Sequence, residues 1–517
     1  MPRQKNSTNS RNGCITCKFR HVKCDEVKPA CGQCTSTARK CDGYNNESQR
    51  QLRQKLTDSS HTRRRISPDS RLVLVPGTRE EREYIHLFCT QTSKSLSGFF
   101  QSDLWLYYLP QLSQSEPAVR HAVAAVSATH KRLLEAVGVV ADDDHQAEPF
   151  VLEQYNKAIR SLVPHPAGSV QAARHPSRKL ILVTCSLFIC LELMKSNNTQ
   201  AMDHAEAGLR ILCRDERVAD DGDSELPSNI ESELSDFFSR MNLERSFFGR
   251  PMIPYKLTLE KPTEEKFQFA NMSQARGALT KLLTLVFVLV RRTVMFNVNL
   301  SEVERQECLR AQDTLIQECK KWEAAFQQLR KRLEKSKKRA DSDQRAPLVL
   351  QVQYLTAWIF INTCLAPDQM VYDKYNPEYH DLVTAAEQIS QLSPPITERT
   401  ESFSLETYTV ASVYWTARKC RHPMIRRRAI AVLETYPRQE GLWATREKYA
   451  VAKFNMELEE ESLVHLPVEE RVPDERHRFF ETQIYEEGAH NPCEVVFLTA
   501  PENPGDEWGR RFEKVWW

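Results

Sequence analysis

The sequence feature that most constrains this chain is a group of six cysteines between Cys14 and Cys41. The spacing C-x2-C-x6-C occurs twice, and six residues separate the two halves. An oxidised disulfide framework is one explanation for so many cysteines in a short stretch. However, nine other cysteines are scattered singly along the 517 residues, and no apolar N-terminal region suggests a secretory signal. A reduced, metal-binding cluster is therefore the better interpretation.

Zinc coordination explains the number of cysteines. A Zn²⁺ ion binds four ligands in a tetrahedron, usually thiolates or imidazoles, and no histidine stands at ligand spacing here. Two ions need eight ligand positions, so six thiolates suffice only if two of them bridge both ions. The internal repeat predicts that the first cysteine of each half forms the bridge, which gives Cys14 and Cys31. The complete predicted ligand set is Cys14, Cys17, Cys24, Cys31, Cys34 and Cys41.

The segment resembles the fungal Zn₂Cys₆ binuclear-cluster DNA-binding domain in its cysteine spacing, in the basic run Lys18–Asp25 and in the loop that contains Pro29. The resemblance implies that the first helix enters the major groove of double-stranded DNA over a CGG-type triplet. His21 stands where the family more often has Lys or Arg. The residues that the resemblance places at the DNA are Lys18, Arg20, His21 and Lys23.

The charge distribution also favours nucleic acid as the partner. Residues 1–70 contain 15 Lys and Arg against 6 Asp and Glu, whereas the remainder contains 56 against 63. A basic module on an acidic body is typical of a tethered DNA-binding protein. The alternative is a zinc-dependent nuclear adaptor that does not contact DNA. The density of basic side chains between Lys18 and Lys23 favours the DNA-binding interpretation.

Composition divides the chain into four parts. Residues 1–45 form the Zn₂Cys₆ module, with the cluster itself at 14–41, and residues 46–79 form a basic polar linker. Residues 80–465 are expected to form an α-helical regulatory domain, and residues 466–517 a tail with a candidate β-hairpin. The predicted fold class is therefore mainly α, with a minor C-terminal β element.

The linker offers only Leu52 and Leu56 as coiled-coil positions, fewer than the three or four heptads that a coiled coil needs. Any homodimer is therefore expected to form through the α-helical domain. The basic segment His61–Arg65 is either a nuclear-import signal or an ordinary solvated linker.

Helical periodicity dominates the long body of the chain. One predicted helix starts at Pro117 and ends near Gly138, with proline at its start and glycine after its end. The apolar run Leu282–Val290 is too short to span a membrane and is expected to be a buried helix, so no membrane partner is predicted. The other predicted helices are Arg178–Met194, Ala201–Cys213, Ser228–Arg245, Gln274–Met295 and Leu348–Leu365.

Two further segments each leave two interpretations. Apolar residues recur at spacings of four and three from Cys308 to Leu333, which suits either a partner-helix interface or a core helix. The bulky Trp322 and Phe326 in this series favour the core. The acidic stretch Met456–Leu463 is either an activation segment or, more commonly for such sequences, a solvated helix end.

The body also resembles the fungal-specific transcription-factor middle domain over most of residues 80–450. This resemblance implies an α-helical regulatory region, and in some relatives a small apolar ligand such as a sterol is sensed there. Nothing in the sequence identifies such a pocket. The blocks that carry the resemblance are Ser97–Phe100, Ser115–His121, Tyr155–Ile159, Arg421–Arg428 and Gly441–Trp443.

An enzymatic function has little support in the sequence. The chain has only 15 glycines and contains no phosphate-binding glycine loop, no G-x-S-x-G and no H-E-x-x-H motif. All six cluster cysteines would be zinc ligands, so no open catalytic position is left on the metal. We therefore expect a nuclear, RNA polymerase II-type transcription regulator that acts with the transcription machinery. Relatives often control biosynthetic gene clusters of secondary metabolism, which makes such a cluster the candidate target.

Overall fold

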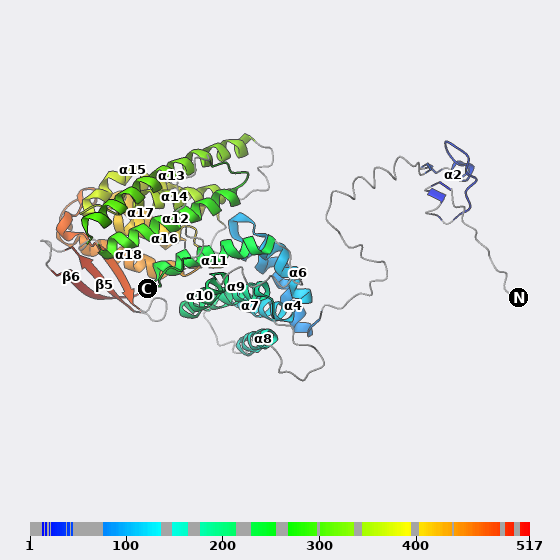
Figure 1. Ribbon diagram of the computed structural model, residues 1–517, viewed down its shortest axis with the longest axis horizontal. Coiled ribbons are helices and arrows are strands. Elements are labelled where there is room, and N and C mark those ends of the chain that lie inside the picture. The colour runs from blue at the N-terminus through cyan, green and yellow to red at the C-terminus, as the bar shows by residue number, and fades with distance from the viewer. Residues whose placement is uncertain are drawn as a thin grey trace. The chain divides into compact units, whose positions relative to one another are not determined.

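The computed structural model divides into two compact units, residues 1–74 and residues 75–517 (Figure 1). The first unit contains the cysteine cluster and the second contains the long helical body. The residues that the structure describes are 13–14, 16–17, 20, 22–37, 39–41, 43–44, 76–135, 147–163, 176–213, 229–254, 267–296, 300–335, 344–393, 403–436, 439–485, 492–500 and 507–517. The predicted linker residues Leu52 and Leu56 and the basic segment His61–Arg65 lie outside these ranges.

The two halves of the cysteine repeat fold alike. Helix α2 (Gly32–Thr35) starts directly after Cys31, in the second half. After this helix, the N–H of Arg39 donates to the carbonyl oxygen of Cys34 at 3.0 Å. At the equivalent place in the first half, the N–H of Val22 donates to the carbonyl oxygen of Cys17 at 3.2 Å. The repeated sequence thus produces a repeated backbone turn after the C-x2-C pair.

The second unit is mainly helical, as predicted. Its helices of five residues or more are α4 (Arg79–Leu87), α5 (Ser93–Ser97), α6 (Leu109–Ser115), α7 (Pro117–Glu135), α8 (Ala147–Leu162), α9 (Arg178–Met194), α10 (Asn198–Cys213), α11 (Asn229–Phe247), α12 (Met272–Phe296), α13 (Glu302–Lys335), α14 (Arg345–Thr363), α15 (Asn376–Gln391), α16 (Val410–Lys419), α17 (Pro423–Thr435) and α18 (Thr445–Glu459), with π-helical turns at Phe88–Thr92 and Leu104–Tyr108 and a 3₁₀ segment at Gln369–Tyr375. Helix α9 has the predicted bounds, and the other predicted helices differ from the observed ones by a few residues at their ends.

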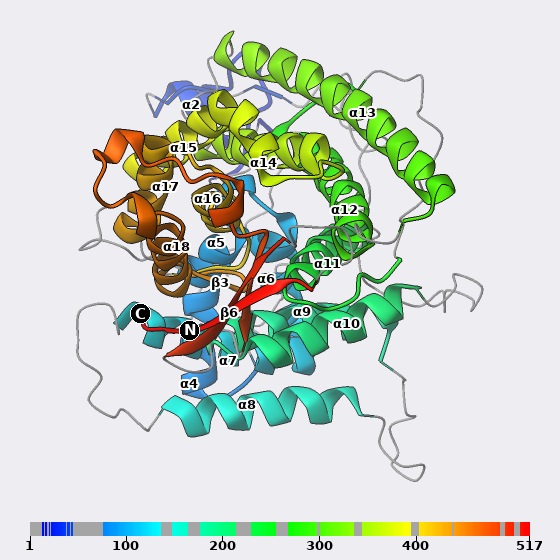
Figure 2. The same cartoon turned by 90° about the vertical axis from the view of Figure 1, so that its left-hand side faces the viewer.

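Helix α16 lies in the middle of the C-terminal half of this unit. It packs against α14, α15, α17 and α18, which surround it in Figure 2. Its N-terminal N–H groups meet the buried carboxylate of Glu440. Oε2 of Glu440 accepts hydrogen bonds from the N–H groups of Tyr408, Thr409 and Val410 at 2.8, 2.8 and 2.9 Å. A carboxylate at this position satisfies donors that a helix start leaves unpaired.

Helix α13 is a core helix, as the sequence favoured. The side chains of Trp322 and Phe326 are buried, and so are Cys308, Leu315, Cys319 and Leu329 of the same series. The indole Nε1 of Trp322 donates to the carbonyl oxygen of Ala275 on α12 at 2.9 Å. This hydrogen bond fixes α13 against α12, and the two helices lie side by side with α14 in Figure 1.

Helix α12 is longer than the apolar run that predicted it. Its segment Met272–Thr293 is long and apolar enough to cross a membrane by length and composition, with a mean hydropathy of 1.3 over the most apolar window. Half of that window is buried inside the protein, and the helix packs against α11, α13 and α14. This packing is what a core helix of a folded domain shows, so composition alone is weak evidence for a membrane span.

The C-terminal β element contains one strand more than predicted. Strands β4 (Glu481–Tyr485) and β5 (Cys493–Thr499) form the expected antiparallel pair, and β6 (Gly509–Val515) adds to the other edge of β5. A second small sheet joins β1 (Phe403–Ser404), β2 (Gln439–Glu440) and β3 (Trp443–Ala444). Strand β6 was missed because its sequence, Gly509–Val515, is charged at four of its seven positions and shows no apolar alternation.

The acidic stretch Met456–Leu463 is not a solvated helix end throughout. Glu459 and Glu460 are only 1% and 3% exposed. Glu459 is ion-paired with Arg421 at 2.9 Å and with Arg426 at 2.7 Å, and all three side chains are fully buried. Glu459 thus joins α18 to Arg426 of α17 and to Arg421 just before α17, and Glu460 is ion-paired with Arg427 of α17 at 2.5 Å. The interpretation as a solvated helix end was therefore wrong for these two carboxylates.

Candidate metal centre and nucleic-acid interface

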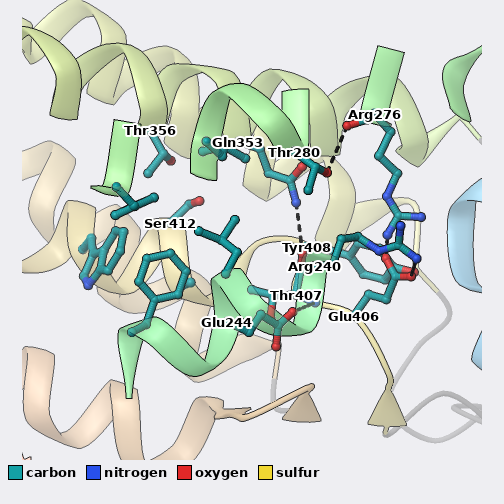
Figure 3. Close-up of a pocket in the computed structure, with 16 residues that line it drawn as sticks. Arg240, Glu244, Arg276, Thr280, Gln353, Thr356, Glu406, Thr407, Tyr408 and Ser412 are labelled. Carbon is teal, nitrogen blue, oxygen red and sulfur yellow. Dashed lines mark hydrogen bonds and ion pairs between the residues drawn. The ribbon is translucent and has the colours of Figure 1, made fainter. Parts of the chain in front are cut away.

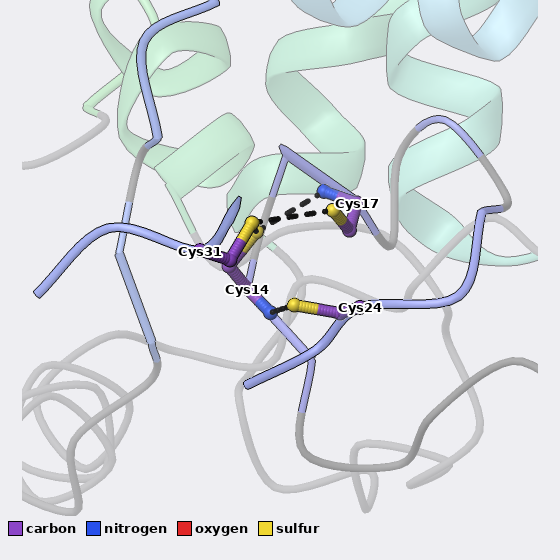
Figure 4. A group of neighbouring side chains, drawn as sticks. All are labelled: Cys14, Cys17, Cys24 and Cys31. Carbon is purple, nitrogen blue, oxygen red and sulfur yellow. Dashed lines mark hydrogen bonds between the residues drawn. The ribbon is translucent and has the colours of Figure 1, made fainter. Parts of the chain in front are cut away.

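The structure brings the sulfur atoms of the six cluster cysteines together. One group of four consists of Cys14, Cys17, Cys24 and Cys31, and within it all sulfur atoms lie within 4.8 Å of one another (Figure 4). The second group, with the same maximum distance, consists of Cys14, Cys31, Cys34 and Cys41. Cys14 and Cys31 belong to both groups, as the internal repeat predicts for the bridging pair.

The spacing of these sulfur atoms suits tetrahedral zinc. A Zn–S bond of about 2.3 Å places two thiolates of one tetrahedron about 3.8 Å apart. The sulfur of Cys31 lies 3.5 Å from that of Cys14 and 3.6 Å from that of Cys17. In the second group, the sulfur of Cys14 lies 3.8 Å from that of Cys34. The donor set therefore fits two Zn²⁺ ions, which when bound would hold the two halves of the module together.

The surroundings of the cysteines influence how readily they lose their protons. Burial raises the pKa of the Cys14 and Cys31 thiols. Burial also acts to raise the pKa of Cys24, but the N–H groups of Cys14 and Glu26 donate to its sulfur and bring the pKa to about 7. Because zinc binds thiolates, the ions must displace these protons, which makes zinc affinity dependent on pH.

Two of the four predicted DNA contacts can be placed. Lys23 is exposed, and Arg20 is half-buried. Nη1 of Arg20 donates to Oγ1 of Thr37 at 3.2 Å, so Arg20 also joins the two halves of the module. Lys18 and His21 lie outside the described residues. Lys28, Arg39 and Lys40 are also exposed and lie within the cysteine segment of the sequence, and their positive charges suit a partner with negative charge.

Three residues support the cluster although the spacing argument did not single them out. The hydroxyl of Tyr44 donates to the carbonyl oxygen of Val27 at 2.8 Å and lies 3.8 Å from the sulfur of Cys24. Oδ1 of Asp25 accepts from the N–H of Gly32, the first residue of α2, at 3.2 Å. A Cβ atom at Gly32 would lie 2.5 Å from Oδ2 of Asp25, so a larger residue there would have to displace this carboxylate. The position of Tyr44 just after the last cysteine is the only sequence signal for its role.

Comparison with known families matches both parts of the chain. Residues 12–51 match the family described as the fungal Zn(2)-Cys(6) binuclear cluster domain. Residues 83–405, more than half of the chain, match the family described as the fungal specific transcription factor domain. No solved structure matches the chain.

Individual proteins are also similar to parts of this chain. The aspercryptin biosynthesis cluster-specific transcription regulator atnN of Emericella nidulans is 33% identical over 222 residues, which cover 40% of this chain and 35% of that protein. The transcription regulator lscL of Purpureocillium lilacinum is 26% identical over 234 residues, covering 42% of this chain and 52% of that protein. Sterol uptake control protein 2 of Candida albicans is 53% identical over 45 residues, 9% of this chain and 6% of that protein. The chain thus matches about a third to a half of the length of the first two.

Proposed function

The chain belongs to the fungal-specific transcription factor family, and we propose that it is a zinc-dependent, sequence-specific DNA-binding regulator of transcription by RNA polymerase II. One observation carries this proposal: the two four-sulfur groups share Cys14 and Cys31 within a basic N-terminal module. Such a module has no apolar core of its own, so two bound Zn²⁺ ions would supply its folding energy. In this proposal the ligands are Cys14, Cys17, Cys24, Cys31, Cys34 and Cys41.

The proposed DNA contacts divide into two kinds. Lys18 and Lys23 contact phosphates, which gives affinity and salt dependence without reading sequence. His21 and Arg20 are the candidates for contacts to base edges in a CGG-type half-site. The hydrogen bond from Arg20 to Thr37 supports a structural role for Arg20, which leaves His21 as the first candidate for base reading.

The site of action follows from the proposed activity. A regulator that binds promoters and acts with the transcription machinery works in the nucleus, where the basic segment His61–Arg65 would serve import. Because only Leu52 and Leu56 occupy coiled-coil positions in the linker, we place any homodimer contact in the helical body. The similarity to a cluster-specific regulator supports a biosynthetic gene cluster as the target.

Selection of bound sequences from random duplex DNA tests the proposal. The purified full-length protein with zinc is expected to enrich one short motif that contains a CGG-type triplet. Cys14→Ala, which removes a sulfur common to both four-sulfur groups, is the matched control and is expected to enrich nothing. Enrichment of one triplet or of a pair at fixed spacing reports whether a monomer or a dimer binds.

The same experiment distinguishes the adaptor hypothesis. A zinc-loaded, folded protein that enriches no motif and retains no duplex DNA at low salt would contradict direct DNA binding. The adaptor function would then be the better account of the zinc module. Motif enrichment by the Cys14→Ala protein would instead show that the cluster is not the DNA-reading element.

A further inference from the structure

The cavity between α11, α12, α14 and α16 is small, and the charged side chains around it already have partners (Figure 3). Its volume is about 70 Å³. Arg240 and Arg276 are both ion-paired with Glu406, and Oε1 of Glu244 accepts from the N–H of Thr407 at 3.2 Å. A polar cavity of this size suits ordered water better than a ligand. Unpaired charge and exposed apolar area occur together elsewhere, on the surface at strand β6.

Strand β6 forms one edge of the C-terminal sheet, and Figure 2 shows it in front of the helices of the body. Its residues pair with β5 from Gly509 to Val515. On its other side, no hydrogen bond joins its backbone to any residue that the structure describes. An edge strand presents a row of N–H and C=O groups to which another extended segment can add as a further strand.

The side chains on the outward face of β6 alternate between basic and aromatic. Neighbouring residues of a strand point to opposite faces. Val515 and its partner on β5 are buried, so the residues between them in the alternation, Arg510, Phe512 and Lys514, lie on the outward face. All three are exposed, Phe512 by 69%, and Trp516 continues the alternation in the sequence with 66% exposure. Charged side chains alone protect an edge strand from aggregation, but exposed aromatic rings between them are typical of a binding surface.

The outward face of the sheet has a net positive charge. Neither Arg510 nor Lys514 forms an ion pair with any residue that the structure describes. Lys514 lies opposite Glu494 of β5, so one carboxylate faces two cations. Glu481, on the same face of β4, is ion-paired with Arg418 at 2.8 Å and does not compensate them. An acidic partner would complement this face.

Pairing of β6 with the same strand of a second copy is less favourable. An antiparallel pair centred on Phe512 places Arg510 opposite Lys514 at two places, and like charges directly opposite each other destabilise a strand pair. The same register brings Arg511 opposite Glu513, but these two residues are already ion-paired within one strand at 2.8 Å. A centre on Arg511 or on Glu513 places two identical charges opposite each other.

We propose that β6 binds an extended acidic segment of a partner protein, which adds to the C-terminal sheet as a further strand. Main-chain hydrogen bonds to β6 align the segment, two of its carboxylates contact Arg510 and Lys514, and an apolar side chain between them packs on Phe512. The expected motif is acidic–x–apolar–x–acidic, which is the same in both chain directions. This proposal goes beyond DNA binding and does not depend on it.

Fluorescence anisotropy with the zinc-loaded full-length protein tests this inference. The probe is the fluorescein-labelled peptide Leu-Thr-Glu-Thr-Leu-Thr-Glu-Thr-Leu, whose sequence is palindromic. It is expected to bind at low ionic strength and more weakly as salt is added. The same peptide with Gln or Lys in place of both Glu residues is expected to bind about tenfold more weakly or not at all.

N-methylated forms of the peptide test whether it binds as a strand. Every second residue of a strand directs its N–H and C=O groups to the same neighbouring strand. One form carries N-methyl groups on its Thr residues, and the other carries them on its Leu and Glu residues. One of the two forms is expected to bind like the unmodified peptide, and the other is expected not to bind.

Charge-reversal variants locate the site. In the double variant Arg510→Glu, Lys514→Glu, the Lys peptide is expected to bind about tenfold more tightly than the Glu peptide, which reverses the preference of the parent protein. The matched control is the double variant Lys331→Glu, Lys335→Glu. It makes the same charge change at exposed positions of α13 and is expected to keep the preference of the parent protein.

A second pair of variants tests the aromatic contact. Phe512→Ser is expected to weaken binding of the Glu peptide about tenfold, because an aromatic anchor is lost. Tyr485→Ser is the matched control, since Tyr485 is 50% exposed on the same face but belongs to β4, at the other edge of the sheet. This control is expected to bind like the parent protein.

Five results would overturn the proposal. The Glu peptide does not bind, or the parent protein binds the Gln or Lys peptide as tightly. The two N-methylated forms bind equally, or the α13 control reverses its charge preference as well. The fifth is a dimer in sedimentation that Phe512→Ser dissociates, which would show that β6 pairs with a second copy. If Phe512→Ser does not fold, the charge-reversal variants and the peptide series still decide the question.

Discussion

The sulfur atoms of Cys14 and Cys31 lie 3.5 Å apart, and the two residues hold equivalent positions in the two halves of the cysteine repeat. A second pair of equivalent positions, Arg20 and Thr37, is also in contact, through a hydrogen bond of 3.2 Å. Contact between equivalent positions is what an approximate two-fold relation between the halves requires. The sulfur atoms of Cys14 and Cys31 therefore lie between the two halves, next to both proposed metal positions.

The first prediction concerns zinc stoichiometry. The parent protein is expected to contain two Zn²⁺ ions per chain by elemental analysis. Cys14→Ala and Cys31→Ala are expected to lose both ions, because each removes a sulfur that belongs to both four-sulfur groups. Cys17→Ala removes a sulfur from one group only and is expected to retain about one ion.

The control for this experiment is Cys213→Ala, which changes an exposed cysteine outside the cluster and should keep both ions. A stoichiometry of one zinc in the parent protein would contradict the binuclear assignment. Equal zinc loss in Cys14→Ala and Cys17→Ala would contradict the bridging role.

The second prediction separates base reading from phosphate contact. His21→Ala is expected to lower the ratio of specific to scrambled-duplex affinity, whereas His21→Arg is expected to tighten binding to a CGG-type half-site by about 1 kcal/mol, because Arg makes a bidentate contact to guanine. Lys23→Ala is expected to weaken binding to all duplexes equally and to reduce the salt slope by about one. Gel-shift titrations at two salt concentrations measure both quantities.

An unchanged affinity ratio in His21→Ala would exclude His21 as the base reader and make Arg20 the leading candidate. Because Arg20 also donates to Thr37, Arg20→Ala removes this hydrogen bond as well as any base contact. A second variant is therefore needed that removes only the hydrogen bond. Thr37→Val removes the acceptor and leaves the guanidinium in place. A loss of specificity in Arg20→Ala that Thr37→Val does not reproduce would assign base reading to Arg20.

The third prediction concerns Gly98, where α5 ends. Gly98 has a φ of +59°, and a Cβ atom there would overlap the hydroxyl oxygen of Tyr408. Gly98→Ala is expected to lower the free energy of unfolding by about 3 kcal/mol or more, because backbone strain and the overlap add. Denaturant unfolding measures the change.

Gly249→Ala is the matched control. Gly249 also has a positive φ, of +78°, but a Cβ atom there would meet nothing within 4 Å. This substitution is expected to cost about 1 kcal/mol from backbone strain alone. Adding Tyr408→Phe to Gly98→Ala should recover part of the loss, and equal costs at the two glycines would disprove the overlap.

The fourth prediction concerns the pH dependence of stability. Burial acts to raise the pKa of Glu459, but Arg421 and Arg426 outweigh it and bring the pKa to about 2. The folded-state pKa is thus below the unfolded value of about 4.3. The ionised carboxylate therefore stabilises the fold above pH 4.3, by about 3 kcal/mol, and this contribution disappears as the pH falls toward 2.

Comparison of Glu459→Gln with the parent protein isolates this contribution. The difference in free energy of unfolding is expected to be largest near pH 6 and to shrink below pH 4. Glu457→Gln, on the exposed side of the same helix, is the control and should follow the parent at every pH. A difference that does not change with pH would mean that ionisation of Glu459 contributes nothing.

The sequence by itself determined the features that depend on local spacing. The doubled C-x2-C-x6-C pattern predicted two ligand groups with a shared pair, because residues so close in the chain have few ways to surround a metal. Helical periodicity likewise located α7, α9 and α12, and the series around Trp322 marked α13 as a core helix. Each of these signals is contained within one short segment.

Only the tertiary structure decided where the charged residues of the body lie. Glu459 meets Arg421 and Arg426 from 38 and 33 residues away, and Glu244 meets Thr407 from 163 residues away. From its own segment alone, a polar side chain is predicted to be exposed to solvent, because helical periodicity shows only which apolar residues share a face. Burial of such a residue depends on distant segments that supply its partners. For this reason neither the buried ion pairs nor the cavity between α11 and α16 could be predicted from spacing or composition.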